Sequence, residues 1–344
     1  MFDIITIGTA TRDIFLRSKY FKEFKDKDLK KFGISSGAAE CFEWGGKLEV
    51  DKPVLTIGGG AANAAVTFVR QGFRAATLFK VGDDRPGEGL VLELKKNKIH
   101  TLPLLDKKMG TAYSTILLSH SGERTVLVYR GASSDIKSSE IPYKQLKAKW
   151  VYIVPGSIPL GTMKKIFSTF EKNKTLIAMN PSGHYLDLGL KALAPFLSKL
   201  AVLSLNLEEA QMLAGGTSSD IKKVLHILHK VVPGLVVVSD GPRGVVVSDG
   251  KHIYQAGTYR EKAVVDRTGA GDAFGSGFVA GLIHRGIMSY KTKLKAGDIE
   301  YAIKLGSANG TSVVEHIGAE EGILRKKDMQ NSRWKNLSIS KKPL

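Results

Sequence analysis

The sequence predicts an α/β fold of three layers, in which a central, mainly parallel sheet lies between two layers of helices and carries a small β lid. Short apolar runs rich in β-branched residues alternate with amphipathic segments along most of the 344-residue chain. Each apolar run ends in turn residues, which is typical of strands in a repeating βα pattern. Two regions, about 14–53 and 110–131, interrupt this alternation and are predicted to form the lid.

The first elements follow from periodicity and from their end signals. DIITIG predicts a buried strand, and AANAAVTFVRQG predicts a helix that ends at Gly72. AATLFKVG predicts a second strand, and PGEGLVLELKKN a helix opened by Pro86. The segment GTAYSTILLSHSGERTVLVYRG, residues 110–131, predicts a hairpin that turns at HSGE.

The second half of the chain continues the alternation. Strands are predicted for KWVYIVPG, TLIAMNP, LAVLSLN and GLVVVSDG. Between and after them, helical patterns are predicted for GTMKKIFSTFEKN, GLKALAPFLSK, LEEAQMLAGG and DIKKVLHILHK. Ligands of such sheets bind beyond the carboxyl ends of the strands. The polar residues at those ends are therefore candidate site residues: Asn180, Asn206, Asp240 and Gly241.

Composition narrows the class of protein. With 43% hydrophobic and 24% charged residues the chain is an ordinary globular one, and no run approaches the roughly 18 apolar residues of a membrane span. Cys41 is the sole cysteine, so no internal disulfide can form, and a cytoplasmic location is expected. The segment 326–344 is basic and weakly patterned, and its end is expected to be mobile.

The net charge of +18 allows three interpretations: a nucleic-acid surface, attraction of anionic substrates, or a solvated basic shell. The lysines occur in short, scattered groups without interleaved aromatic residues. A surface that binds single-stranded nucleic acid would combine basic side chains with aromatic side chains on which the bases stack. The pattern therefore favours the solvated shell and argues against nucleic acid as a partner.

The stretch VVDRTGAGDAFGSGFVAGLI, residues 264–283, joins a glycine-rich turn to a helix of small residues. The first N–H groups of a helix lack internal partners and carry partial positive charge, so they can hold an anion. Asp272 stands at the same place and can accept a proton from an attacking hydroxyl, as phosphoryl transfer requires. The alternative is that Asp272 only caps the helix and the glycines only form a turn.

Two further clusters place polar groups at helix starts. In IGGGAANAAV, residues 57–66, Asn63 can offer its amide to a ligand, and it replaces the third glycine of a dinucleotide-binding pattern. In NLEEA, residues 206–210, Asn206 and Glu209 share one helical face and are expected to organise Mg²⁺ through water molecules. The alternative is an Asn cap followed by acids in the first helical turn.

Six motifs in this order together resemble the ribokinase-like family, also called the PfkB carbohydrate kinases, which includes adenosine kinases. They are GTATRD, GGGAANAAV, NLEE, SDGPRG, DRTGAGDAFGSGF and ANGTSVVEHIGA. The resemblance spans about residues 3–325 and implies one kinase domain over residues 1–325, followed by the basic tail 326–344. It implies the family's ribokinase-like α/β fold with a β lid, which agrees with the fold predicted from the pattern.

The resemblance implies roles for individual residues around the acceptor. It makes Asp272 the general base. The anion hole would be formed by the start of the same helix, at Gly269, Ala270 and Gly271. The hydroxyls of the acceptor would be held by residues from the first part of the chain: Asp13, Gly59, Gly60 and Asn63.

The resemblance also implies sites for the nucleotide and for cations. Nucleotide-binding roles would fall to five residues, with the last near the adenine: Asn206, Ser239, Gly241, Gly244 and Asn309. Glu209 would bind Mg²⁺ through water. Asp266 and Thr268 would contribute to a monovalent-cation site, which in this family is often filled by K⁺.

The implied activity is transfer of the γ-phosphoryl group of ATP to a sugar hydroxyl, with a nucleoside as the alternative acceptor. A nucleobase would need an apolar slot, for which Phe42, Trp44 and Tyr113 are candidates. A sugar phosphate would need a cation, for which the candidates are Lys47, Arg124 and Arg130. A non-catalytic regulator that binds nucleotide or sugar is disfavoured because Asp272, Asn206 and Glu209 are all present.

Two further points concern a residue that departs from the family pattern and a possible assembly of two chains. Arg267 stands where relatives often have a small residue, and it could contact a nucleotide phosphate or be solvated. The lids of relatives sometimes pair between subunits, so the resemblance also allows a homodimer formed through the lid.

Overall fold

The computed structural model describes residues 1–34, 36–119, 123–216, 218 and 220–344. Within them, the centre of the molecule is a sheet of ten strands. Its parallel strands are β1 (Phe2–Gly8), β6 (Ala75–Gly82), β7 (His100–Asp106), β10 (Ala148–Val154), β11 (Leu176–Met179), β12 (Val202–Asn206) and β13 (Leu235–Ser239). Antiparallel strands β14 (Val245–Ser248), β15 (His252–Ala256) and β16 (Ile339–Pro343) extend one edge. The order is β16-β15-β14-β13-β12-β11-β10-β1-β6-β7.

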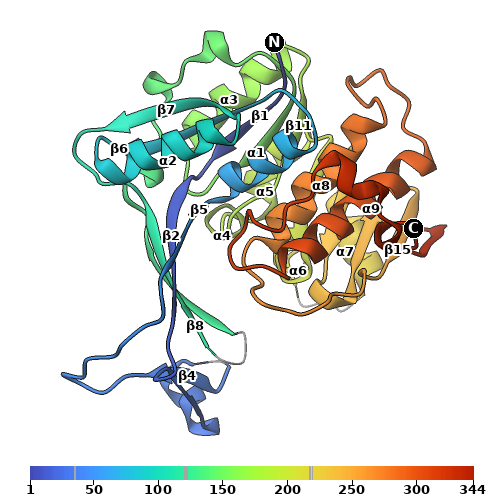
Figure 1. Ribbon diagram of the computed structural model, residues 1–344. Coiled ribbons are helices and arrows are strands. Elements are labelled where there is room, and N and C mark those ends of the chain that lie inside the picture. The colour runs from blue at the N-terminus through green and yellow to red at the C-terminus, as the bar shows by residue number, and fades with distance from the viewer. Residues whose placement is uncertain (35, 120–122, 217, 219) are drawn as a thin grey trace.

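Helices cover both faces of this sheet, because successive strand residues point to opposite sides (Figure 1). Ile5 and Val151 belong to the core on one face, whereas Ile4 and Tyr152 belong to the core on the other. The first face is covered by α3 (Leu160–Lys172), α4 (Gly183–Leu186), α5 (Gly189–Leu197), α6 (Leu207–Leu213) and α7 (Ile221–His229). The second is covered by α1 (Gly60–Arg70), α2 (Arg85–Lys96), α8 (Ala270–His284) and α9 (Ala296–Val313). The predicted fold class is thereby confirmed.

A second sheet forms the lid, which projects from the body in Figure 1. Its strands, in the order β5-β2-β8-β9, are β2 (Thr11–Arg17), β5 (Val54–Gly58), β8 (Tyr113–Leu118) and β9 (Arg124–Tyr129). At its tip, β3 (Lys22–Lys25) pairs with β4 (Ala38–Cys41). The predicted ranges 14–53 and 110–131 thus miss the start of β2 and all of β5. The predicted hairpin pairs as β8 and β9, and residues 120–122 of its turn lie outside the described residues.

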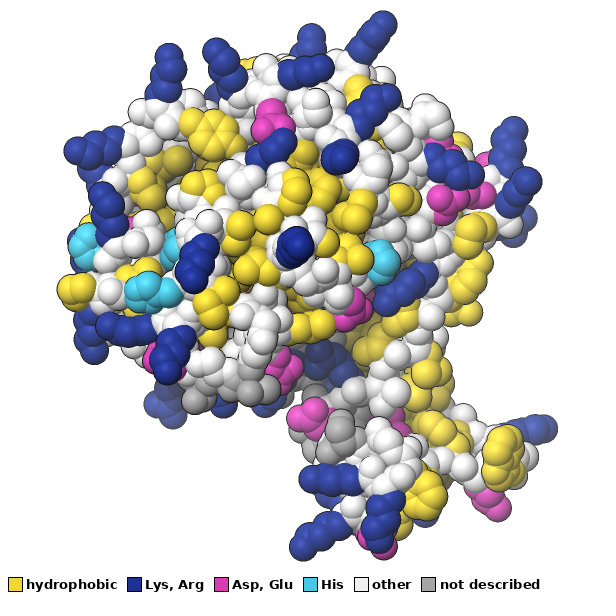
Figure 2. Space-filling model, turned by 180° about the vertical axis from the view of Figure 1, so that it is seen from behind, with side chains coloured by type: hydrophobic (Ala, Val, Ile, Leu, Met, Phe, Trp, Pro, Cys, Tyr) yellow, Lys and Arg dark blue, Asp and Glu magenta, His cyan; other side chains and the backbone are white. Residues whose placement is uncertain are grey.

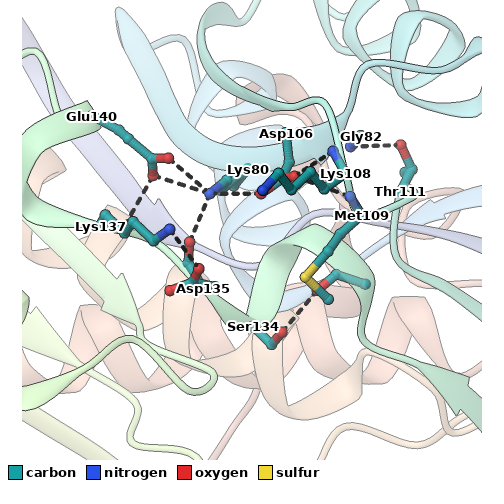
Figure 3. A network of polar contacts seen from close by, with 11 residues as sticks. Lys80, Gly82, Asp106, Lys108, Met109, Thr111, Ser134, Asp135, Lys137 and Glu140 are labelled. Atoms are coloured by element: carbon teal, nitrogen blue, oxygen red, sulfur yellow. Dashed lines mark hydrogen bonds and ion pairs between the residues drawn. The ribbon is translucent and has the colours of Figure 1, made fainter.

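The root of the lid is held by a network around Lys80, whose side chain is fully buried (Figure 3). Lys80 Nζ lies 3.0 Å from Asp106 Oδ2 and 2.9 Å from Glu140 Oε1, and it donates to the Asp135 carbonyl at 2.8 Å. Asp106 ends β7, which precedes the hairpin, whereas Asp135 and Glu140 follow it. The two chain segments that enter and leave the β8–β9 hairpin of the lid are therefore fixed to the end of β6 by one ammonium group.

The end of the C-terminal segment was predicted to be mobile, and this prediction is wrong because the end forms a strand. Ile339–Pro343 form β16, which pairs along its whole length with β15. Trp334 is buried and packs edge-on against Tyr259. The alternating pattern of the five residues of β16 was too short to predict a strand from sequence. The strand forms because β15 offers an edge with which it can pair. The remaining short helices are η1 (Lys27–Phe32), η2 (Gly131–Ser134), η3 (Ser138–Glu140), η4 (Tyr143–Gln145), η5 (Gly241–Arg243), η6 (Lys326–Gln330) and η7 (Ser332–Trp334).

The surface carries its positive charge in a dispersed form. Figure 2 shows lysine and arginine side chains spread over one face of the body, with apolar and uncharged groups between them. Among the residues described, no helix has both the length and the apolar character needed to cross a membrane.

Candidate active site

The strand order changes direction at β1, and this places the candidate site. The chain passes from β7 through the lid to β10, on the other side of β1. Ligands of open α/β sheets bind beyond the carboxyl ends of the strands at such a point. Gly8 ends β1 with a φ of +146°, and a Cβ there would lie 1.8 Å from the Val154 carbonyl oxygen. Glycine therefore permits the close approach of the β1 and β10 ends.

The first turn of α8 brings Asp272 to this edge, where its side chain is half-buried. Gly269 precedes the helix with a φ of +77°, a conformation that glycine adopts without strain. Asn63, in the first turn of α1, donates from Nδ2 to Asp272 Oδ2 at 2.9 Å. Gly60 lies against the same carboxylate, since a Cβ on it would be 3.1 Å from Asp272 Oδ1. The two glycine-rich motifs thus meet at the predicted base.

Asp13 reaches the same place from β2 of the lid and is 7% exposed. Thr11 Oγ1 donates to Asp13 Oδ1 at 2.8 Å, and the Ser114 side chain forms a second hydrogen bond with the carboxylate. Gly58 leaves room for it, because a Cβ there would lie 1.9 Å from Asp13 Oδ2. Gly59 caps α1 without a side chain, at a φ of +89°. The residues predicted to hold the acceptor are therefore neighbours of Asp272.

Three carboxylates interact through this space. Burial raises the pKa of Asp272, the hydrogen bond from Asn63 lowers it, and the negative charge of Asp13 raises it again. Burial is also the main reason why the pKa values of Asp13 and Glu209 are raised, and the charge of Asp272 contributes to the shift of Glu209. Such a concentration of negative charge suits a hydroxyl donor or a cation.

Asn63 has an unused acceptor beside the base. Its Oδ1 atom is buried and finds no hydrogen-bond partner within the described part of the chain. A buried polar atom without a partner is costly, so a ligand that donates a hydrogen bond would be favoured here. A hydroxyl group has the required donor.

On the other side of the α8 start lies a pocket of about 260 Å³. It contains most of the residues predicted for the nucleotide and the anion hole: Ser239, Gly241, Gly244, Ala270 and Gly271. Its walls also include apolar side chains, namely Pro242, Val264, Phe274 and Val314. The pocket therefore joins an apolar slot to the unpaired N–H groups of a helix N-terminus.

Asn206 and Glu209 form the helix cap that the alternative interpretation predicted. Asn206 Oδ1 accepts from Glu209 N, and Glu209 Oε2 accepts from Asn206 N, both at 2.8 Å. The cap does not remove them from the site, because Asn206 pairs with the pocket residue Ser239 across β12 and β13. Within the described residues, no three metal-binding side chains are grouped to hold an ion directly. A cation held here through water remains compatible with this arrangement.

Asp266 and Thr268 lie in the turn before α8. Asp266 is fully buried, and its Oδ1 accepts from Thr268 N at 2.9 Å and from Thr268 Oγ1 at 2.7 Å. Its Oδ2 accepts from Gly318 N at 3.0 Å. These contacts use three of the roughly four acceptor positions of a carboxylate. The pair fixes the turn that carries the anion hole.

Asn309 does not lie in the nucleotide pocket, contrary to expectation. It is fully buried between α8 and α9, where its Nδ2 donates to Ala273 O at 2.8 Å and its Oδ1 accepts from Leu324 N at 2.9 Å. The reason is helical phase, because the pocket is lined by Ser307, Gly310 and Thr311 of α9 and by Val314, which follows the helix. Asn309 therefore joins two helices, and these four residues were missed by sequence reasoning.

Other site residues could not have been found from local patterns. Ser114 reaches Asp13 only because β8 pairs with β2, with Asp13 opposite Ser114.

Tyr113 and its cross-strand neighbour Tyr129 lie on the opposite face of the lid from Asp13, because adjacent strand residues alternate. Trp44 is fully exposed at the lid tip. Neither Tyr113 nor Trp44 therefore forms a slot beside Asp13.

Comparison with known proteins places this arrangement in a family. Residues 27–326 match the model of the pfkB family of carbohydrate kinases. The chain is 29% identical over 228 residues to a cytidine kinase of Thermococcus kodakarensis, which covers 65% of this chain and 79% of that protein. It is 24% identical over 278 residues to a ribokinase of Bacillus subtilis, covering 79% and 86%.

The fold also matches a solved structure. Arabidopsis thaliana ribokinase, complexed with ribose and ATP, superimposes with a TM-score of 0.72 at 17% identity, over 97% of this chain and 98% of that one. The family match extends over most of the chain and includes both glycine-rich motifs that meet at Asp272. The protein therefore belongs to the pfkB family of carbohydrate kinases and is a phosphotransferase that acts on a hydroxyl group.

Proposed function

We propose that the protein transfers the γ-phosphoryl group of ATP to a hydroxyl of a neutral sugar. The observation that carries this proposal is the position of α8 between two sites. Ala270 and Gly271 line the nucleotide pocket, whereas Asp272, the next residue, contacts Asn63 and lies near Asp13. One helical turn thus joins a pocket for the nucleotide to a place for an alcohol.

The chemistry follows from this geometry. The acceptor hydroxyl donates to Asp272 and is oriented by Asp13 and Asn63. Its oxygen bonds to the γ-phosphorus while the bond to the β–γ bridging oxygen breaks, ADP leaves, and the proton passes to Asp272. The N–H groups at Gly269, Ala270 and Gly271 stabilise the charge that develops on the transferring group. Mg²⁺, when bound through water near Glu209 and Asn206, would neutralise phosphate charge.

The lid face that carries Asp13 favours a sugar over the other acceptors. The cross-strand row through Asp13 consists of Thr56, Asp13, Ser114 and Val128. The next row on the same face contains Val54, Phe15, Ile116 and Val126, of which Phe15 is buried. These rows offer neither an exposed aromatic slot for a nucleobase nor a cation for a sugar phosphate. Cations on that face, Arg17 and Arg124, stand two rows beyond Asp13.

The test is an acceptor screen with the full-length enzyme. ADP formation is measured with ATP, Mg²⁺ and one acceptor at a time from three classes: neutral pentoses and hexoses, sugar phosphates, and nucleosides. We expect acceptor-dependent ADP release that is fastest with a neutral sugar. Faster turnover of a nucleoside than of any sugar would show that the acceptor is a nucleoside. ADP release that no acceptor stimulates would overturn the kinase function. Repeating the active assay with K⁺ replaced by Na⁺ tests the cation role of Asp266 and Thr268.

A homodimer through the lid belongs to the same proposal. Leu55, Ile14, Thr115 and Leu127 are successive neighbours across the four lid strands, on the face opposite Asp13. Leu55 and Leu127 are 60% and 55% exposed, and Figure 2 shows apolar side chains along the projecting lid. A second copy would cover this row. Light scattering should give twice the chain mass for the wild type and the chain mass for Leu55→Glu. Equal masses for both proteins would contradict the interface.

A further inference from the structure

Arg267 is a cationic side chain in the wall of the nucleotide pocket. Within the described residues, no hydrogen bond or ion pair of its guanidinium is found. Arg243, which stands between the pocket residues Pro242 and Gly244, differs in this respect, because its Nε and Nη2 atoms donate to Asp240 at 2.7 and 2.6 Å. Arg267 therefore presents an unneutralised, five-donor group to whatever fills the pocket.

The backbone at Arg267 is held in place from both sides. Asp266 before it is anchored by Thr268 and by Gly318. On the other side, the Arg267 carbonyl accepts from Ala270 N at 3.4 Å at the start of α8. The guanidinium thus extends from a fixed turn beside the helix N-terminus, so little backbone freedom is lost when it binds a ligand.

The surroundings specify the chemistry of that ligand. The pocket is apolar on the side of Phe274, Val264 and Val314, and its other side is formed by Ala270 and Gly271 in the first turn of α8, where the helix dipole is positive. Glu261 lines it as well and lies near Arg333, whose guanidinium is already paired with Glu315. A ligand with a flat apolar part and a polyanionic part satisfies both sides, and Arg267 offsets the repulsion that Glu261 would exert.

We propose that Arg267 is a specificity-determining residue that binds a phosphate retained by the leaving nucleotide, so that it recognises ADP and ATP alike. This inference rests on the proposed function. It follows from the separation of the two sites, because the pocket that contains Arg267 does not include Asp13, Asn63 or Asp272. Arg267 would make this contact equally well before and after the phosphoryl group is transferred. Its loss should therefore weaken nucleotide binding without changing the rate of the chemical step.

The experiment measures equilibrium binding of ADP and of adenosine to the wild type, Arg267→Gln and Arg267→Lys by calorimetry. We expect Arg267→Gln to weaken ADP binding by about 10- to 100-fold, as for loss of a hydrogen bond to a charged group. Adenosine affinity should change less than about twofold, and Arg267→Lys should fall in between because lysine keeps the charge but not the planar fork. In turnover, KM for ATP should rise while kcat stays constant.

Arg243→Gln is the matched control, and it should leave ADP affinity unchanged because the Arg243 charge is already paired. Unaltered ADP affinity in Arg267→Gln, or an equal loss for ADP and adenosine, would overturn the inference. So would a lower kcat with unaltered ADP affinity. Wild-type protein that binds neither ADP nor ATP would instead overturn the proposed function, so the two failures can be told apart.

Discussion

Asn63 and Asp272 form the side-chain contact that joins the two glycine-rich motifs. Burial alone would leave the pKa of Asp272 higher still, because the Asn63 hydrogen bond opposes it. The base must be ionised to accept a proton, so activity is lost as pH falls through the raised pKa of Asp272. This dependence makes the contact measurable.

Asn63→Ala should therefore shift the pH profile. Without the hydrogen bond that lowers the pKa of Asp272, the acidic limb of kcat/KM for the acceptor should move to higher pH. The acceptor KM should also rise, because the Oδ1 acceptor is lost. Asn97→Ala is the control, since Asn97 only caps α2, and its profile should match the wild type. An acidic limb in Asn63→Ala that stays in place or moves to lower pH would contradict the account.

At the scale of elements, the lid depends on the buried ammonium of Lys80 (Figure 3). Burial by itself would lower the pKa of Lys80, but the contacts with Glu140 and Asp106 outweigh burial and raise it. The group is therefore charged at neutral pH. It balances two carboxylates from segments on either side of the lid hairpin.

Lys80→Met should destabilise the protein by about 3 kcal/mol, the lower end of the range for breaking a buried pair, because Asp106 and Glu140 are partly exposed. Urea denaturation measures the free energy of unfolding. Lys137→Met removes an exposed pair with Asp135 and should cost less than about 1 kcal/mol. Equal losses in the two variants would show that the buried network does not hold the lid root.

Elements with strong local signals were predictable, and elements defined by their neighbours were not. Pro86 was predicted to open α2 and stands in its first turn, and Gly72 was predicted to end α1 and follows it with a φ of +88°. The antiparallel edge β14–β16 and the length of α9 were missed, because their patterns become distinctive only when the adjacent strand or helix is in place. Asn309 was wrongly predicted to lie near the adenine for the same reason. A sequence can indicate that a residue is helical, but it does not show which neighbouring element the side chain contacts.

At the scale of the whole molecule, the C-terminal strand closes the edge of the central sheet. Removing residues 338–344 deletes β16 and leaves β15 as an unpaired edge. We expect the free energy of unfolding to fall on the order of 2 kcal/mol, from a few backbone hydrogen bonds. Changing Lys341 and Lys342 to Ser keeps the strand and should cost little. A truncated protein as stable as the full chain would contradict the assignment of this strand.

The fold brings distant parts of the chain to one edge: Asp13 from the lid, Asn63 from α1 and Asp272 from α8. Sequence patterns singled out Asn63 and Asp272, and the resemblance to a family added Asp13 and supplied the roles of all three. Their proximity depends on long-range strand pairing and on close approaches that only glycine allows at Gly8 and Gly58. The walls of the nucleotide pocket depend on the packing of α9 and therefore became visible only in the structure.

The most direct test of the central claim is the single-turnover rate of phosphoryl transfer in Asp272→Asn, measured with ATP and the best acceptor both bound. Asn keeps the size of the side chain and its hydrogen bond with Asn63, so the affinities for nucleotide and acceptor should stay within a few-fold. Loss of the base should slow transfer by about 10²- to 10⁴-fold. A near-wild-type rate, with both ligands bound normally, would contradict the assignment of Asp272 as the base.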